Sequence, residues 1–149
     1  MKIRKAVIDD FIAIHLLNSF GLGYDYPTEK TKKRLAYILS LRGAKFLVAE
    51  VDDIVVGYIH AVDYDCTYSD PVKDILALAV DEEYRRKGVG LALVAAIEKW
   101  AYSTGACGVR LVTSSLGKAL TGFMRHAATR SGGNKRTTLS CLRETDMSL

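Results

Sequence analysis

The chain has 149 residues, 49% of them hydrophobic, and a formal net charge of +4. This length suits one domain spanning residues 1–149, and the apolar content is enough for a sizeable core. There is no run of 18 apolar residues, so we expect no transmembrane helix, and the aspartates that follow the basic first residues are not typical of a signal peptide. The three cysteines show neither metal-ligand spacing nor a disulfide framework. We therefore expect reduced thiols in the cytoplasm and no bound metal.

The first part of the chain predicts one strand and two helices. Residues 2–7 alternate between polar and apolar as a strand does. Asp9 or Asp10 is a candidate cap for the first helix. The segment 21–27 contains glycine and proline and predicts a loop. Thr28 is the candidate cap of the second helix.

Three β-rich runs follow. Residues 45–51 and 54–62 predict a hairpin, because an aspartate pair, Asp52-Asp53, stands between them as a turn signal. A polar loop is expected over 63–71. The run 72–80 is apolar on both faces in its second half, so we expect a central, buried strand.

The last part predicts two further helices and two strands. Apolar residues recur at helical spacing over 89–100, and Gly105 is expected to end that helix. A strand over 109–113, a helix over 118–129 and a strand over 136–143 complete the chain. The order β-α-α-β-β-β-α-β-α-β predicts an α/β fold with a mixed sheet and helices on both of its faces.

The junction between the strand 72–80 and the next helix is the most informative segment. Gly88 and Gly90 lack side chains, so the backbone can come close to a ligand. The helix that follows directs its free N–H groups and positive dipole end at this loop. The basic triplet 85–87 adds positive charge beside it. Together these features predict a site for phosphate oxygens rather than a flexible helix start.

The sequence of this loop does not match two common nucleotide-binding motifs, but it resembles another phosphate-binding loop. No Gly-Lys-Ser/Thr closes it as in a nucleoside-triphosphate loop, and the full Gly-x-Gly-x-x-Gly of dinucleotide-binding folds is absent. The pattern Arg85-x-x-Gly88-x-Gly90 resembles the pyrophosphate loop of the GCN5-related N-acetyltransferase (GNAT) family, and residues 75–100 resemble that family's acetyl-CoA-binding core. The resemblance implies a mostly antiparallel sheet and acetyl-CoA as co-substrate. It also implies that the strand carrying Leu78 and its neighbour near Val109 splay apart around the pantetheine arm.

The resemblance also implies a set of cofactor-binding residues. They comprise the end of the splayed strand, the glycine loop with the start of its helix, and two residues further on that match weaker contacts. The set is Leu78, Ala79, Val80, Arg85, Arg86, Lys87, Gly88, Val89, Gly90, Leu91, Ser115 and Lys118.

Acetyl transfer to an amine requires removal of a proton from a group whose pKa is about 10 in solution. Asp74 aligns with the glutamate that histone-acetylating relatives carry, so it is the candidate base; the alternative is an ordinary strand-end carboxylate in solvent. Many relatives use the tyrosine of a Phe-Tyr pair to protonate the leaving thiolate. This chain has Phe123-Met124, and a thioether cannot donate a proton. Either water or another residue protonates the thiolate, or the thiolate leaves without a proton. The missing tyrosine also leaves a second interpretation open, namely a catalytically weak acyl-CoA-binding protein of the same fold.

The acceptor side is indicated by carboxylates and aromatic rings. Asp63 and Asp65 lie in an acidic window, and Tyr24 and Tyr26 lie in the interhelical loop that covers the acceptor in relatives. Such groups suit a cationic amine, through Coulomb attraction and cation–π contact. The alternative is a solvated acidic loop with surface tyrosines. The three histidines are expected to pack or lie at the surface, and His60 is placed to reach the acceptor cavity.

These patterns predict an N-acetyltransferase that moves acetyl from acetyl-CoA to a primary amine of a small molecule or peptide, by direct attack in a ternary complex. A nucleic-acid-binding module is disfavoured, because the basic residues are dispersed and no basic surface is interleaved with aromatic residues. No membrane partner is expected. A homodimer is compatible with the resemblance, because dimers are common in the family.

Overall fold

The computed structural model describes residues 1–111, which form a five-stranded sheet and three α-helices. The strand order is β1-β2-β3-β4-β5; the first three pairings are antiparallel and the last is parallel. This confirms the mixed, mostly antiparallel sheet, while the predicted helix 118–129 and strand 136–143 lie outside the described residues. The elements are β1 (Lys2–Lys5), α1 (Phe11–Leu16), α2 (Thr28–Ser40), β2 (Ala44–Val51), β3 (Ile54–Tyr64), β4 (Val72–Val80), α3 (Val89–Ser103) and β5 (Gly108–Leu111).

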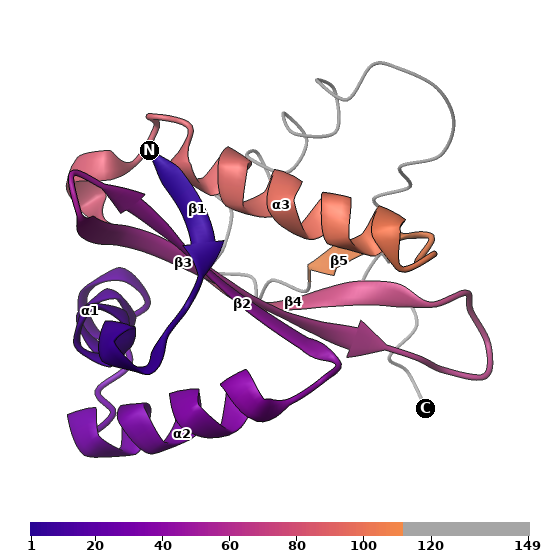
Figure 1. Cartoon of the computed structure of the whole chain (residues 1–149), viewed down its shortest axis with the longest axis horizontal. Coiled ribbons are helices and arrows are strands. Elements are labelled where there is room, and N and C mark those ends of the chain that lie inside the picture. The colour runs from indigo at the N-terminus through magenta and orange to yellow at the C-terminus, as the bar shows by residue number, and fades with distance from the viewer. Residues whose placement is uncertain (112–149) are drawn as a thin grey trace.

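Helices cover both faces of the sheet, as Figure 1 shows, with α1 and α2 on one side and α3 on the other. The two faces have separate cores because side chains alternate along each strand. Ile59 and Leu93 are fully buried in the core under α3, whereas Val48 and Leu35 belong to the core under α1 and α2. No helix within residues 1–111 is long and apolar enough to cross a membrane.

The hairpin between β2 and β3 forms as predicted. Asp52 and Asp53 take φ angles of 49° and 62°. Two consecutive residues in the left-handed region make the tight turn whose twist matches a hairpin, and aspartate tolerates that region better than most residues.

The two predicted helix caps are wrong in detail. Asp10 precedes α1, but its backbone is already helical and it makes no capping bond there. Its carboxylate instead accepts the Val7 N–H at 2.8 Å and two bonds from Arg4 at 2.8 and 2.9 Å. Thr28 is the first residue of α2 rather than its cap, and Pro27 stands at the cap position without a side-chain bond.

Strand β4 departs from the expected continuous burial. His60 of β3 pairs with Ala77 and Ala61 pairs with Ile75, so Leu76 is the extra residue of a β-bulge and is 55% exposed. The bulge shifts the alternation by one residue. Lys73 and Ile75 before it, and Leu78 and Val80 after it, therefore all lie on the α3 face.

Within the described residues, β5 covers only the first half of β4. The parallel pairing runs from Val72↔Gly108 to Ile75↔Leu111, and the remainder of β4 pairs only with β3 there. The described residues end at Leu111, and the open edge that the resemblance implies past the bulge stays a prediction.

Candidate active site

A short turn connects β4 to α3 and is fixed at its first residue. The N–H of Asp81 donates to the Val56 carbonyl at 2.8 Å, and the Asp81 carboxylate accepts the Glu83 N–H at 2.9 Å. The second of these bonds caps a 3-10 turn, Glu82–Tyr84. The chain therefore leaves the sheet at a defined position before it enters the glycine loop.

Gly88 supplies the backbone conformation that starts α3. Its φ is +85°, in the left-handed region, and a Cβ placed on it would meet no atom within 4 Å. Glycine is needed here for the conformation rather than for space. The first intrahelical bond runs from the Ala92 N–H to the Gly88 carbonyl at 3.0 Å, so the N–H groups of residues 89–91 have no intrahelical acceptor. The start of this 15-residue helix is thus suited to an anion.

The basic triplet surrounds this helix start. All three side chains are exposed. The Nε of Arg85 donates to the carbonyl of Val80 at 3.1 Å, so this arginine is tied to the end of β4. The ammonium of Lys87 lies 5.2 Å from the ring centre of Tyr84. Arg86 has a φ of 61°, a second strained position in the same turn. Their contact with a cofactor remains a prediction, as does that of Leu91.

A third glycine, which sequence analysis did not select, allows α3 to approach the sheet. A Cβ on Gly57 of β3 would lie 2.9 Å from the carbonyl oxygen of Ala79 and 3.3 Å from Cγ1 of Val89. Only a residue without a side chain allows this approach of β3, β4 and the first turn of α3. A glycine inside a strand pattern was the signal available in the sequence. Ser115, Lys118 and Met124 lie outside the described residues.

Asp74 forms an ion pair. Its two carboxylate oxygens accept bonds from Nε and Nη2 of Arg110 at 3.1 and 2.9 Å, and 13% of its side chain is exposed. This geometry raises the pKa of Arg110 above its ordinary value, chiefly through the bond to Asp74. The alternative of a free carboxylate in solvent is therefore wrong. The role of Asp74 as a base stays a prediction. In that role, its carboxylate must accept the proton of the amine while it is paired with Arg110.

The predicted acceptor residues do not come together. Asp63 pairs with Lys73, whose ammonium lies 4.0 Å from the ring centre of Trp100 on α3. Asp63 therefore lies on the α3 face, whereas Tyr24 belongs to the loop that precedes α2, on the opposite side of the sheet. The sequence did not show which face of β3 Asp63 occupies, and its role in acceptor binding stays a prediction. Tyr24, Tyr26 and Asp65 are exposed, and their binding role stays a prediction.

Polar groups that sequence analysis gave little weight lie beneath that interhelical loop. The hydroxyl of Tyr58 donates to Oδ1 of Asn18, in the π-helical turn Leu17–Gly21. Burial, and secondarily the charge of Tyr24, raises the pKa of Tyr58. His60 stands two residues further along β3, on the same face, with its ring stacked on Phe46 at 5.2 Å. Burial lowers the pKa of His60, so its imidazole is neutral at pH 7.

This polar cluster adjoins β4 just past the bulge. His60 pairs with Ala77, and a Cβ on Gly21 would lie 3.7 Å from the Cβ of Ala79. The π-helical turn thus packs on β4 just past the bulge. The period-2 alternation in 54–62 was the signal that could have placed Tyr58 and His60 together.

Comparison with known proteins gives a family match and a shared fold. The model of the acetyltransferase (GNAT) family matches residues 9–128. N-acetyltransferase 8 of Homo sapiens is 37% identical over 79 residues, which are 52% of this chain and 35% of that protein. The match thus spans well under half the length of this curated relative.

Solved structures superpose over nearly the whole chain. A putative acetyltransferase from Agrobacterium tumefaciens gives a TM-score of 0.77 at 18% identity, over 91% of this chain and 96% of that chain. AAC(6')-Iy in complex with the bisubstrate analogue CoA-S-monomethyl-acetylneamine gives a TM-score of 0.75 at 20% identity, over 91% of each chain. At these identities the likeness shows the fold.

Proposed function

The chain belongs to the acetyltransferase (GNAT) family, whose enzymes use acetyl-CoA as co-substrate, and we propose that it transfers acetyl from acetyl-CoA to a primary amine. The acceptor is a small molecule or a peptide, and the amine attacks the thioester directly in a ternary complex. Residues 1–149 act in this proposal as one catalytic domain. The observation that carries it is the start of α3, where left-handed Gly88 leaves the N–H groups of residues 89–91 without intrahelical acceptors.

In this proposal the donor lies along β4 and the loop. The diphosphate binds the N–H groups at the start of α3, where they act as donors that need not move on binding. The backbone of Leu78, Ala79 and Val80 pairs with the pantetheine arm. Arg85 holds the end of β4 in place through its bond to the Val80 carbonyl.

The acceptor approaches from the face covered by α1 and α2. Asp74, on that face, has two oxygens that each accept one bond from Arg110. A carboxylate offers about four lone-pair sites, so it can still take the proton of the amine through water. The neutral imidazole of His60 is the second group able to take a proton there. The neighbour AAC(6')-Iy is named with an acetylneamine analogue, which supports a polyamine-like acceptor for this chain.

A second candidate is an acyl-CoA-binding protein of the same fold that transfers poorly. The observation in its favour is the ion pair of Asp74 with Arg110, because a paired carboxylate is a weaker base. This candidate shares the cofactor site of the first and differs only in turnover.

The experiment has two stages. Calorimetry with acetyl-CoA tests the cofactor site, and absence of binding would overturn both candidates. Release of CoA thiol is then measured with an amine panel of aminoglycosides, polyamines, arylalkylamines and peptides with a free N-terminus or lysine. Turnover with any member at least tenfold above its hydroxyl analogue supports the transferase. Tight acetyl-CoA binding without turnover across the panel would favour the second candidate.

A further inference from the structure

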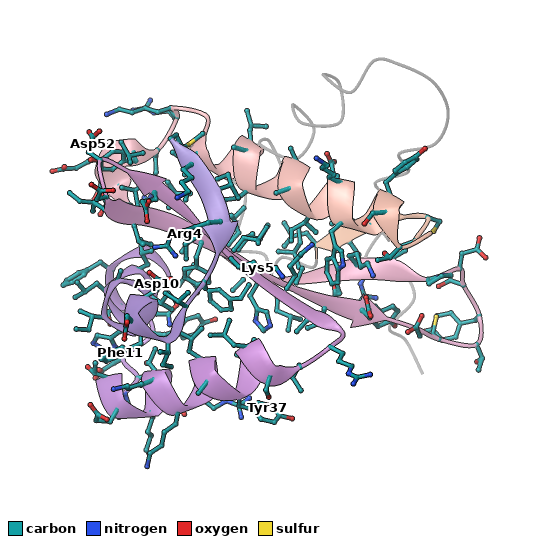
Figure 2. All side chains as sticks on the ribbon, viewed as in Figure 1. Arg4, Lys5, Asp10, Phe11, Tyr37 and Asp52 are labelled. Carbon is teal, nitrogen blue, oxygen red and sulfur yellow. The ribbon has the colours of Figure 1, made fainter. Side chains whose placement is uncertain are left out.

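A hollow of about 600 Å³ lies at the β1 edge of the sheet. It exists because β1 is short. β1 ends at Lys5, and its last bond to β2 runs from the Ala6 N–H to the Phe46 carbonyl at 3.0 Å. The first two residues of β2, Ala44 and Lys45, pair only with β3 in the described chain. Figure 2 shows Lys5 at the end of β1, in the space between α2 and α3.

The hollow has one apolar wall and an excess of positive charge. Phe46 and the aliphatic side chains of the last turn of α2 supply the apolar wall, and Trp100 of α3 lines it too. Lys5, Arg42 and Lys45 supply three cationic groups. None of the described lining residues is acidic. Its volume is in the range of small-molecule sites, which is roughly 300–1,000 Å³.

The three cations have no compensating carboxylate in the described part of the chain. The ion pairs within residues 1–111 use other basic side chains, and Lys73 nearby is already paired with Asp63. The ammonium of Lys45 lies 5.1 Å from the ring centre of Trp100. Burial lowers the pKa of Lys45, and the charges of Lys5 and Lys73 lower it further. An anion placed here would relieve both the desolvation and the mutual repulsion.

We propose that this hollow binds an amphipathic carboxylate, with its aliphatic chain against Phe46 and its carboxylate among Lys5, Arg42 and Lys45. An apolar wall beside cations that have no ion-pair partner within residues 1–111 favours this ligand over a neutral hydrocarbon or a bare inorganic anion. The site is separate from the glycine loop. Trp100 lies eleven residues after the first residue of α3, which is about 16 Å along the helix.

Calorimetry on the full chain tests the proposal, with sodium octanoate as the probe. Octanoate should bind with the same affinity whether or not acetyl-CoA is saturating. Hexanoate, which is two methylenes shorter, should bind about fifteenfold more weakly, because each buried methylene contributes about a fourfold factor. 1-Octanol and inorganic phosphate should each bind at least tenfold more weakly than octanoate, and octanoate affinity should fall as salt rises.

Two variants localise the site. Lys45→Met and Arg42→Met keep the side-chain bulk and remove one charge each, so each should lower octanoate affinity about tenfold while acetyl-CoA affinity is retained. Lys99→Met, at an exposed position next to Trp100, is the matched control and should bind octanoate as the wild type does. The proposal is overturned if octanoate does not bind, if acetyl-CoA displaces it, if octanol or phosphate binds equally well, or if both charge-removing variants keep wild-type affinity.

Discussion

Replacing Gly88 by asparagine or by aspartate separates backbone strain from charge at the cofactor loop. The φ of +85° strains both residues alike, by about 1–2 kcal/mol for an L-residue in the left-handed region. Steric clash adds nothing, because a Cβ at this position meets no atom within 4 Å. Both side chains are comparably good at a helix start, so the two variants should have similar stability.

Affinity for acetyl-CoA should separate the two variants. A carboxylate about 5 Å from one phosphate charge is repelled by about 0.8 kcal/mol in a water-like dielectric, and by about 3 kcal/mol at an effective dielectric constant of 20. Two phosphate charges then make Gly88→Asp at least about tenfold weaker than Gly88→Asn. Titration calorimetry measures both, and the gap should narrow in 0.5 M salt as exposed charges are screened. Equal affinities for the two variants at low salt would refute placement of the diphosphate at the start of α3.

Four further outcomes follow from the described contacts. Gly57→Ala should lower the free energy of unfolding by about 1–3 kcal/mol in urea titration, because its Cβ would lie 2.9 Å from a carbonyl oxygen; an unchanged midpoint contradicts the close packing. Asp74→Asn should lower kcat by about 10²–10⁴-fold while acetyl-CoA affinity is kept, and unchanged turnover between pH 6 and 9 on an active amine removes it as the base. Tyr58→Phe should leave acetyl-CoA affinity intact and alter KM for the amine. A change in acetyl-CoA affinity alone would contradict a role for Tyr58 on the acceptor side. His60 has a lowered pKa in the folded state, so the unfolded state binds the proton more readily and stability falls as pH drops below about 6.5. His60→Gln should flatten that slope in melting experiments between pH 5 and 7.

Helix ends and turns were predictable where the neighbouring residues alone determine the backbone conformation. The aspartate turn at residues 52–53 and the end of α3 near Gly105 depend on neighbouring residues in sequence, and both form as expected. The prediction of Asp10 as the cap of α1 was wrong because its carboxylate binds Arg4 and the Val7 N–H instead. Arg4, six residues earlier, donates to it from two nitrogens, and a helix-cap pattern does not reveal that partner.

The site was predictable only in part, because the bulge in β4 decides on which face of the sheet its side chains lie. Alternation along residues 72–80 would place residues 75 and 78 on opposite faces, but the extra residue Leu76 puts both under α3. No pattern in one sequence marks the position of such a bulge. The ion pair of Asp74 joins two strands 36 residues apart, so it was equally invisible to local analysis.

The bulge also limits where the proton of the amine can go under the proposed reaction. The start of α3 directs the donor to one edge of β4, and the side chains able to accept a proton lie on the face under α1 and α2. On that face the side chains of β4 past the bulge are those of Ala77 and Ala79, which are small. A proton leaving the amine there meets either the paired carboxylate of Asp74 or the imidazole of His60. The pH–rate profile distinguishes them. If His60 is the base, His60→Gln abolishes the rise in kcat/KM on the acid side, whereas Asp74→Asn leaves the position of that rise unchanged.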